Sequence, residues 1–238
     1  MILFCFSYAG GSAMFYKKWQ KYLGEEIKVV PVELQGHGIR YKEKLVNNLE
    51  VICEDIYKIV KVHITNDKFM FLGHSLGGLI AFEFYYYLKK REKKQPTALF
   101  ILGCKAPMYL KLPFALSSDD EKLWKDINSL GGIPDKVNRN ESLKKFFLPV
   151  LKNDFSIIKN YIFNENRTLV SSKMVLISGD KDPLSPNSKE EWQLLCKDKA
   201  DIYFLEGNHF FVLNNGKSIS EIVKKIMNKM EVEKNGIS

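Results

Sequence analysis

Residues 73–77 read Gly-His-Ser-Leu-Gly, which places a serine between glycines at the junction of two apolar segments. Residues 69–72 have the length of a strand, and the apolar stretch after Gly78 has the length of a helix. Serine is a weak nucleophile at its ordinary pKa and needs a neighbouring base and an exposed position. A sharp turn from strand to helix exposes the hydroxyl of Ser75 and requires small residues on both sides. The motif therefore predicts a nucleophile, with an incidental glycine-rich turn as the alternative.

Four histidines are candidates for the base that Ser75 needs. His63 is expected at the surface near a helix end, and the His74 side chain should point to the other side of the turn. His37 and His209 each follow a predicted strand, His37 early in the chain and His209 after the last strand. Functional groups gather at the carboxyl ends of the strands in open parallel sheets. We therefore predict that His209 is the base.

The acid that orients this histidine should follow the preceding strand, where Gly179-Asp-Lys-Asp-Pro183 offers two candidates. Asp180 is so close to the strand that we expect it to hydrogen-bond the loop backbone. Asp182 lies farther round the loop and is the predicted acid. The resulting order, Ser75, Asp182 and His209, is that of α/β-hydrolases and differs from the orders in chymotrypsin and subtilisin.

A second glycine-rich turn, Tyr8-Ala-Gly-Gly-Ser12, follows the first predicted strand. Glycines at a strand end let backbone N–H groups point into open space, which gives either a plain loop or half of an oxyanion hole. We predict that the N–H groups of Ala9 and Leu76 stabilise the oxyanion that forms when Ser75 attacks an acyl carbonyl. His209 would take the serine proton and later activate a water molecule that releases the acid. No spacing typical of a metal site accompanies these groups.

The expected strands are continuous apolar runs that alternate with helical patterns, which favours the α/β class with a parallel sheet covered on both faces. Pro31 lies inside one of these runs and would fit only at a sheet edge or a bulge. The six runs are residues 2–6, 27–34, 69–72, 98–102, 174–178 and 201–205. We expect one α/β-hydrolase domain over residues 1–238.

The alternation of strands and helices breaks at Pro107, and residues 107–163 hold helical patterns without a convincing strand. A helical insertion at this place in an α/β chain is a candidate lid over the site. The alternative is a helical elaboration with ordinary core packing. Within the insertion, Pro149 is expected to limit its helix, because proline lacks the N–H that a helix interior needs.

The composition is that of a globular protein, with 45% hydrophobic and 27% charged residues. No apolar run has the length of a membrane helix and no signal peptide begins the chain, so we expect a cytoplasmic protein. The four cysteines are scattered and are expected to be buried free thiols. The formal net charge of +8 fits either a lysine-rich surface or attraction to an acidic partner. Nucleic acid is not favoured as that partner, because the lysines are spread along the chain without a recognised binding motif.

Taken together, these features resemble the free-standing type II thioesterases of nonribosomal peptide and polyketide synthesis over nearly the whole chain. The matches in the opening turn and the lid are more specific than the G-x-S-x-G motif. The matching stretches are Phe4–Ser12, Gln35–Arg40, Gly73–Gly78, Leu130–Pro134, Phe147–Pro149, Asp154-Phe155, Gly179–Pro183, Trp192 and Gly207–Phe211.

The resemblance implies hydrolysis of acyl groups from the phosphopantetheine thiol of an acyl or peptidyl carrier protein, without a cofactor of the enzyme's own. It also implies that Asp182, and not Asp180, is the acid. Carrier proteins are usually acidic, so the net positive charge of the chain would attract them. We also expect a monomer that does not act on membranes. An esterase or lipase acting on oxygen esters is the main alternative, because it would use the same triad. A non-catalytic binding protein and acyl transfer to another acceptor are further alternatives.

Three features depart from the family pattern. Gln35 replaces a proline, which is expected to alter only the stiffness of the loop. Asn208 replaces a glycine beside His209, and because asparagine tolerates positive φ better than most residues, the loop is expected to keep its shape. The chain also begins almost at its first predicted strand, with a shorter N-terminal extension than the family commonly has.

Overall fold

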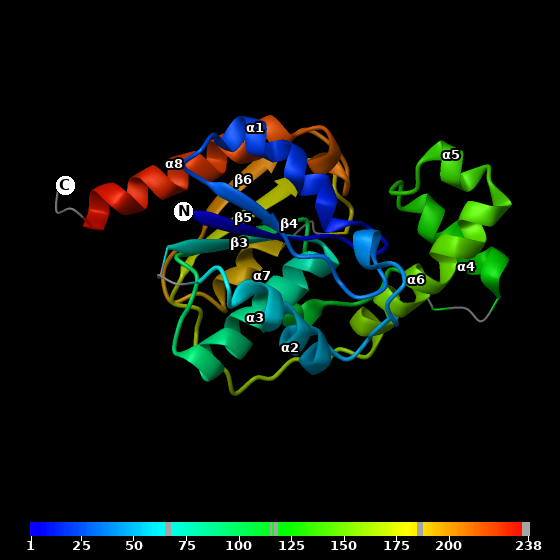
Figure 1. Ribbon diagram of the computed structural model, residues 1–238, viewed down its shortest axis with the longest axis horizontal. Helices are drawn as coiled ribbons and strands as arrows, with labels where there is room; N and C mark the ends of the chain where they lie inside the picture. The colour runs from blue at the N-terminus through cyan, green and yellow to red at the C-terminus, as the bar shows by residue number, and fades with distance from the viewer. Residues whose placement is uncertain (65–67, 115, 117–118, 185–187, 235–238) are drawn as a thin grey trace.

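Six strands form one parallel sheet in the computed structural model, which describes residues 1–64, 68–114, 116, 119–184 and 188–234. The strands are β1 (Ile2–Phe6), β2 (Lys28–Pro31), β3 (Phe69–His74), β4 (Ala98–Leu102), β5 (Lys173–Gly179) and β6 (Asp201–Leu205). Their order across the sheet is β2-β1-β3-β4-β5-β6 (Figure 1). The predicted parallel α/β architecture is confirmed, and Pro31 ends a strand at the edge of the sheet, where a missing N–H costs least.

Helices cover both faces of this sheet. Outside the chain between β4 and β5 they are η1 (Ala13–Trp19), α1 (Gln20–Leu23), η2 (Gly38–Arg40), α2 (Leu49–Val60), α3 (Leu76–Glu92), α7 (Ser188–Gln193), η4 (Phe211–Leu213) and α8 (Gly216–Lys234), where η marks a 3₁₀-helix. Helices α2, α3 and α7 pack on one face, in a core that includes Ile56, Leu79 and Trp192 (Figure 1). The helices η1, α1 and α8 pack on the other face, around Trp19 and Ile219.

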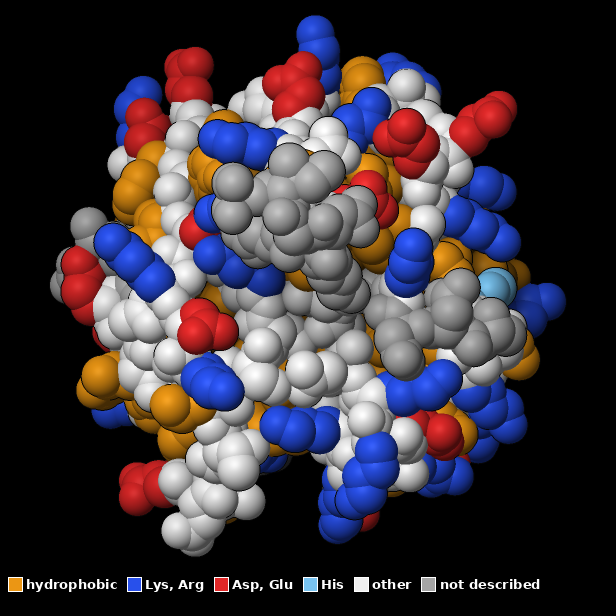
Figure 2. Space-filling model, turned by 90° about the vertical axis from the view of Figure 1, so that its left-hand side faces the viewer, with side chains coloured by type: hydrophobic (Ala, Val, Ile, Leu, Met, Phe, Trp, Pro, Cys, Tyr) orange, Lys and Arg blue, Asp and Glu red, His pale blue; other side chains and the backbone are white. Residues whose placement is uncertain are grey.

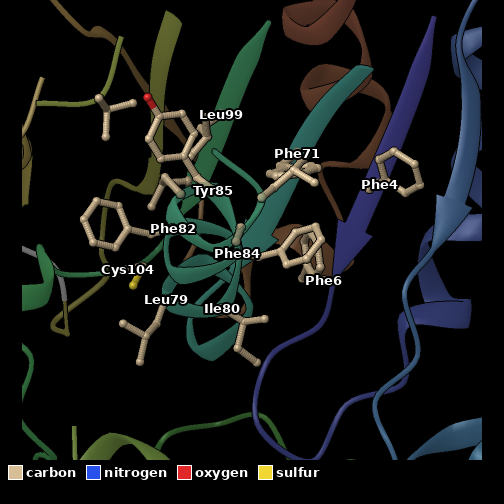
Figure 3. Packing of buried hydrophobic residues seen from close by; sticks show 14 of the residues in the cluster. Phe4, Phe6, Phe71, Leu79, Ile80, Phe82, Phe84, Tyr85, Leu99 and Cys104 are labelled. Carbon is tan, nitrogen blue, oxygen red and sulfur yellow. The ribbon is translucent and has the colours of Figure 1, made fainter. Parts of the chain in front are cut away.

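An aromatic cluster packs the middle of α3 against the centre of the sheet. The ring centroids of Phe6 and Phe71 lie 5.7 Å apart, and those of Phe71 and Phe84 lie 5.4 Å apart (Figure 3). All three side chains are almost completely buried, and burial of each contributes roughly 1.5–3 kcal/mol. The three residues belong to β1, β3 and α3, so the turn from β3 to α3 is held between well-packed elements.

Between β4 and β5 the chain forms helices, and those within residues 120–138 stand apart from the sheet (Figure 1), whereas Ile157 belongs to the core on the sheet. This part of the chain contains η3 (Pro107–Tyr109), α4 (Asp120–Ser129), α5 (Asp135–Asn138) and α6 (Glu141–Lys159). We call residues 107–163 the helical segment, and no strand occurs among those of its residues that the structure describes. It has a small core of its own, which joins Trp124, Val137 and Phe155.

Helix α6 continues through Pro149, so the expectation that this proline limits its helix is wrong. A proline inside a helix costs about 3 kcal/mol. Val150, Leu151 and Phe155 on the same helix are each more than 90% buried. Because burial of one such side chain contributes roughly 1.5–3 kcal/mol, packing outweighs the proline. Asp154 is therefore carried by one continuous helix.

Two expectations drawn from composition can be compared with the folded chain. All four cysteines are buried and free, as predicted. Over the described ranges, no helix combines the length and the apolar character that a membrane crossing requires.

Candidate active site

Ser75 lies at the turn between β3 and α3, with φ 54° and ψ −117°. A non-glycine residue in such a conformation is strained by about 1–3 kcal/mol, and strain of this kind gathers at functional sites. The turn also excludes side chains at two neighbouring positions. A Cβ on Gly73 would lie 2.1 Å from the carbonyl oxygen of Gly77, and one on Gly77 would lie 2.3 Å from that of Phe6. The turn thus requires the small residues from which it was predicted.

His209 lies between Ser75 and Asp182. Its Nε2 is 3.0 Å from Oγ of Ser75, and its Nδ1 is 3.0 Å from Oδ2 of Asp182. Asp182 and His209 are buried, whereas Ser75 is partly exposed. An imidazole in this position can take the serine proton while the carboxylate keeps its other nitrogen protonated. The fold therefore brings together the three side chains that the sequence analysis selected.

The two aspartates of the β5 loop have different partners. Asp180 is exposed, and its carboxylate accepts the backbone N–H of Gly207 at 2.8 Å, as predicted. Asp182 accepts the N–H of Leu184 through Oδ1 at 2.9 Å, which leaves Oδ2 for His209. The geometry thus assigns loop support to the first aspartate and contact with the histidine to the second.

His74 supports the loop that carries His209. Its Nε2 donates to the carbonyl oxygen of His209 at 2.8 Å, and the centroids of the two rings lie 5.0 Å apart. Burial, together with the nearby His209, lowers the pKa of His74 to about 3. The ring is therefore neutral at ordinary pH and acts as a hydrogen-bond donor. His63 is half-buried and packs against Phe4, with ring centroids 6.1 Å apart.

Ala9 and Leu76 both line the cavity beside Ser75. Leu76 is the first residue of α3, so its N–H has no partner within the helix. Ala9 lies in a turn that is closed by a hydrogen bond from the N–H of Gly11 to the carbonyl oxygen of Tyr8, at 2.9 Å. Within the described chain, neither of the two N–H groups donates to a protein acceptor. Both are available to a negatively charged oxygen at the serine.

A cavity of about 830 Å³ lies beside Ser75 and His209. Its volume falls within the range of small-molecule sites. Apolar side chains of the helical segment form much of its wall, among them Leu110, Leu112, Trp124, Ile127, Phe147, Val150, Leu151 and Phe155. Cys104 also lines the cavity, but burial raises the pKa of its thiol to about 12, so it does not compete as a nucleophile.

A second pair of a histidine and an aspartate lies nearby, and the sequence analysis did not find it. Nε2 of His37 is 2.9 Å from Oδ2 of Asp154, which belongs to α6. Both side chains are buried, and the Asp154 carboxylate also accepts the N–H of Gly10 at 2.7 Å. The available signals were a histidine between two glycines after a strand and a single acid within an apolar helical pattern. The sequence analysis weighed His37 only as a base for Ser75.

Asn208, beside His209, stabilises its loop by a side-chain hydrogen bond and not, as expected, by tolerating a positive φ. Ser75 and Lys93 are the non-glycine residues with positive φ among those described, so Asn208 does not adopt that conformation. Its Oδ1 instead accepts the N–H of Phe210 at 2.9 Å. The side chain therefore stabilises the loop by a hydrogen bond, and tolerance of positive φ is not needed.

The family model described as "Thioesterase domain" matches residues 1–230. Linear gramicidin dehydrogenase LgrE of Brevibacillus parabrevis is 30% identical, over 100% of this chain and 91% of that protein. The medium-chain S-acyl fatty acid synthase thioesterase of Rattus norvegicus is 28% identical, over 94% of this chain and 87% of that protein. The crystal structure of ClbQ from the colibactin NRPS/PKS pathway has a TM-score of 0.91 and 30% identity, and covers 97% of this chain and 98% of that one. The likeness in sequence and fold thus extends over almost the whole chain.

Proposed function

The chain belongs to the thioesterase family, and from this membership we propose that it is an editing thioesterase, which hydrolyses acyl groups from the phosphopantetheine thiol of carrier proteins. Ser75, His209 and Asp182 are the proposed catalytic residues. The observation that carries the proposal is their hydrogen-bonded arrangement beside a cavity with largely apolar walls. The arrangement supplies the nucleophile, and the cavity accommodates the acyl chain.

The first half of the reaction forms an acyl-enzyme. His209 takes the proton from Ser75 as the serine oxygen attacks the carbonyl carbon of the thioester. The N–H groups of Ala9 and Leu76 bind the oxyanion of the tetrahedral intermediate. When this intermediate collapses, the C–S bond breaks and the leaving thiolate receives the proton from His209. The acyl group remains on the serine as an oxygen ester.

The second half returns the enzyme to its starting state. His209 takes a proton from water, and the resulting hydroxide attacks the acyl-enzyme. The same two N–H groups bind the second oxyanion, and Ser75 regains its proton as the carboxylic acid leaves. Asp182 keeps the imidazole oriented and stabilises its charged form in both halves. Because side chains and backbone groups of the chain supply every step, we propose that no cofactor is involved.

The comparisons favour a carrier of a peptide or polyketide assembly line. Two of the relatives with 30% identity are named for linear gramicidin and for the colibactin NRPS/PKS pathway. The relative named for fatty acid synthase is 28% identical. We therefore propose the assembly-line carrier as the partner and the fatty acyl carrier as the second choice.

The net charge of +8 supports attraction to an acidic carrier. Figure 2 shows Lys and Arg side chains spread over the face that carries both termini, opposite to the helical segment. Positive side chains thus also lie on a face away from α4 and α5, where they can contribute to long-range attraction (Figure 2). Closer to the site, Lys105, Lys111 and Lys136 line the cavity, and we propose that they are positive charges that the incoming carrier meets.

We propose that the helical segment is a lid within a single domain of residues 1–238. Its support is that α4 to α6 share a core of their own and also form cavity wall beside Ser75. Movement of the segment would change access to the serine. A cytoplasmic monomer stays the prediction from the sequence.

A panel of matched substrates tests the proposed function. The kcat/KM value is measured for one acyl group presented on a carrier protein, on coenzyme A and as a p-nitrophenyl ester, with the free acid identified as product. We expect the carrier protein to be preferred, and we expect added salt to weaken that reaction while hydrolysis of the uncharged p-nitrophenyl ester stays unchanged. A preference for the oxygen ester would support an esterase, and absence of free acid would support acyl transfer.

A fluorophosphonate probe tests whether the chain is an enzyme at all. The probe reacts with activated serines, so we expect it to label the native chain at Ser75 and to leave Ser75→Ala unlabelled. A native chain that stays unlabelled and releases no acid would be a binding protein, which would reject the proposal.

A further inference from the structure

The turn that carries Ala9 is in direct contact with the helical segment. Gly10 has φ +72°, and a Cβ at this position would lie 2.5 Å from Cδ2 of Leu151 in α6. The helix thus packs against the turn at a residue without a side chain. One turn farther along α6, the Asp154 carboxylate accepts the N–H of Gly10 at 2.7 Å.

Asp154 is unusually buried for an acid, with 1% of its surface exposed. A buried carboxylate is unfavourable unless hydrogen bonds and an opposite charge compensate for lost water. Its Oδ2 accepts the N–H of Gly10 and lies 2.9 Å from Nε2 of His37, and its Oδ1 accepts from Nδ2 of Asn153 at 3.2 Å. The proton transfers at Ser75 use none of these contacts.

His37 supplies the compensating charge. Its Nδ1 is 2.9 Å from the carbonyl oxygen of Gln35, and its Nε2 faces Asp154, so both ring nitrogens face acceptors. A neutral imidazole can donate to only one of them, whereas the protonated ring donates to both. The protonated His37 therefore holds the carboxylate oxygen in place at Gly10.

A second carboxylate holds the other end of the same turn. Glu33 accepts the hydroxyl of Ser12 at 2.6 Å and the N–H of Ala13 at 2.9 Å. Two carboxylates therefore hold the turn after Ala9, Asp154 at Gly10 and Glu33 at Ser12. The N–H of Ala9 itself is left for a ligand.

We propose that Asp154, held by His37, is a positioning residue that directs the N–H of Ala9 toward the oxyanion by anchoring the adjacent peptide N–H of Gly10. The inference rests on the proposed function, because Ala9 is taken as an oxyanion donor. Loss of one such donor lowers kcat by about 100- to 1000-fold, so misalignment should lower it by a smaller factor, about 10- to 100-fold. Asp154 itself does not line the cavity, so KM should change little.

The test compares the native chain with Asp154→Ala and Asp154→Asn, using a p-nitrophenyl ester as substrate. Glu83→Ala is the control, because Glu83 also forms an ion pair that is partly buried, with Arg167 at 2.6 Å, and neither residue lines the cavity. The second readout is inhibition by an alkylboronic acid. The oxygen of Ser75 adds to boron, its proton passes to His209, and an oxygen of the tetrahedral adduct occupies the oxyanion site.

We expect Asp154→Ala to lower kcat about 10- to 100-fold and to weaken the boronic acid by a similar factor. Asp154→Asn keeps an oxygen that can accept the N–H of Gly10, so it should recover much of the loss. Glu83→Ala should lower thermal stability while kcat and boronic acid affinity stay near native values. Native values of both quantities in Asp154→Ala, or losses matched by Glu83→Ala, would overturn the proposal.

His37→Gln serves if Asp154→Ala does not fold. We expect kcat and boronic acid affinity to fall together in this variant, and unchanged values of both would overturn the proposal. The ester substrate also separates this inference from the proposed function. A native chain that hydrolyses the ester but no carrier thioester would contradict the proposed substrate, while the comparison of variants would still decide the role of Asp154.

Discussion

Two histidine–aspartate pairs lie close to one cavity, and they differ in what the second ring nitrogen faces. In the pair of His209 and Asp182, that nitrogen faces a serine hydroxyl, which can both give and receive a proton. In the pair of His37 and Asp154, it faces the carbonyl oxygen of Gln35, which can only accept a hydrogen bond. The first pair can therefore move a proton, whereas the second can only hold one.

The two aspartates show the same division of roles. Asp182 accepts the N–H of Leu184 and orients a histidine that meets the nucleophile. Asp154 accepts the N–H of Gly10 and joins two segments that are far apart in the chain. A histidine–aspartate pair is thus not by itself evidence of acid–base catalysis. The third partner of each pair decides whether it transfers protons or fixes a backbone.

The largest effect should follow removal of the nucleophile. Ser75→Ala is expected to lower kcat by about 100,000-fold or more, because the oxygen that attacks the acyl group is gone. The fold should be kept, since a Cβ is present in both side chains. Hydrolysis assays and thermal unfolding check this, and undiminished hydrolysis would contradict the assignment of Ser75.

The next largest effect should separate the two aspartates of the β5 loop. Asp182→Asn is expected to lower kcat about 10,000-fold, because the amide favours the wrong tautomer of His209. Asp180→Asn is the matched control, and its kcat should stay within about threefold of the native value, because its partner is the loop N–H of Gly207. Equal losses in the two variants would contradict the division of roles.

An intermediate effect should follow from crowding the turn of the second pair. Gly10→Ala places a Cβ against Leu151 and should both destabilise the fold and lower kcat about tenfold, because the N–H of Gly10 moves away from Asp154. Gly24→Ala is the control, since Gly24 has a similar φ of +70° and nothing within 4 Å of the added atom. It should destabilise by about 1–3 kcal/mol through backbone strain alone, because its ψ of −160° places it in a region that is almost exclusive to glycine, and it should leave kcat unchanged. If Gly10→Ala kept the native kcat, the turn at Gly10 would have no role in catalysis.

The smallest effect is expected in the pH dependence of stability. Burial lowers the pKa of His37, but its hydrogen bond with Asp154 and the charges of Asp154 and Glu33 outweigh burial, so the pKa is raised above the ordinary 6.5. A histidine with a raised pKa in the folded state contributes stability that is full below its unfolded pKa and is lost as pH rises through its folded pKa. The stability difference between the native chain and His37→Gln should therefore be larger at about pH 6 than at about pH 9. Denaturant unfolding at the two pH values measures it, and a constant difference would contradict a charged His37.

The triad could be selected from the sequence because its members follow strands. In a parallel sheet, the residues after successive strands meet at one edge, so Ser75, Asp182 and His209 were brought together by strand order alone. The tight turn at Ser75 was equally visible, since the steric limits at Gly73 and Gly77 demand small residues. Local patterns and strand order are sufficient for this half of the site.

The second pair could not be selected in this way. His37 and Asp154 are 117 positions apart, and Asp154 lies on a helix whose place is set by packing of the helical segment. No local pattern predicts where such a segment meets the turn at Gly10. The continuity of α6 through Pro149 has the same origin, because tertiary burial overrides a local helix breaker.

The strained conformation of Ser75 has a consequence for transplanting this active site. Glycine adopts φ 54° without penalty, so selection for thermostability alone would favour replacing the nucleophile with glycine. A serine can adopt this strained conformation only where other interactions offset the free energy of the strain. Here the packing of Phe6, Phe71 and Phe84 contributes that stabilisation. A designer who grafts the five-residue turn onto another sheet must therefore choose a protein whose packing at the strand-to-helix turn is stable enough to offset the strain.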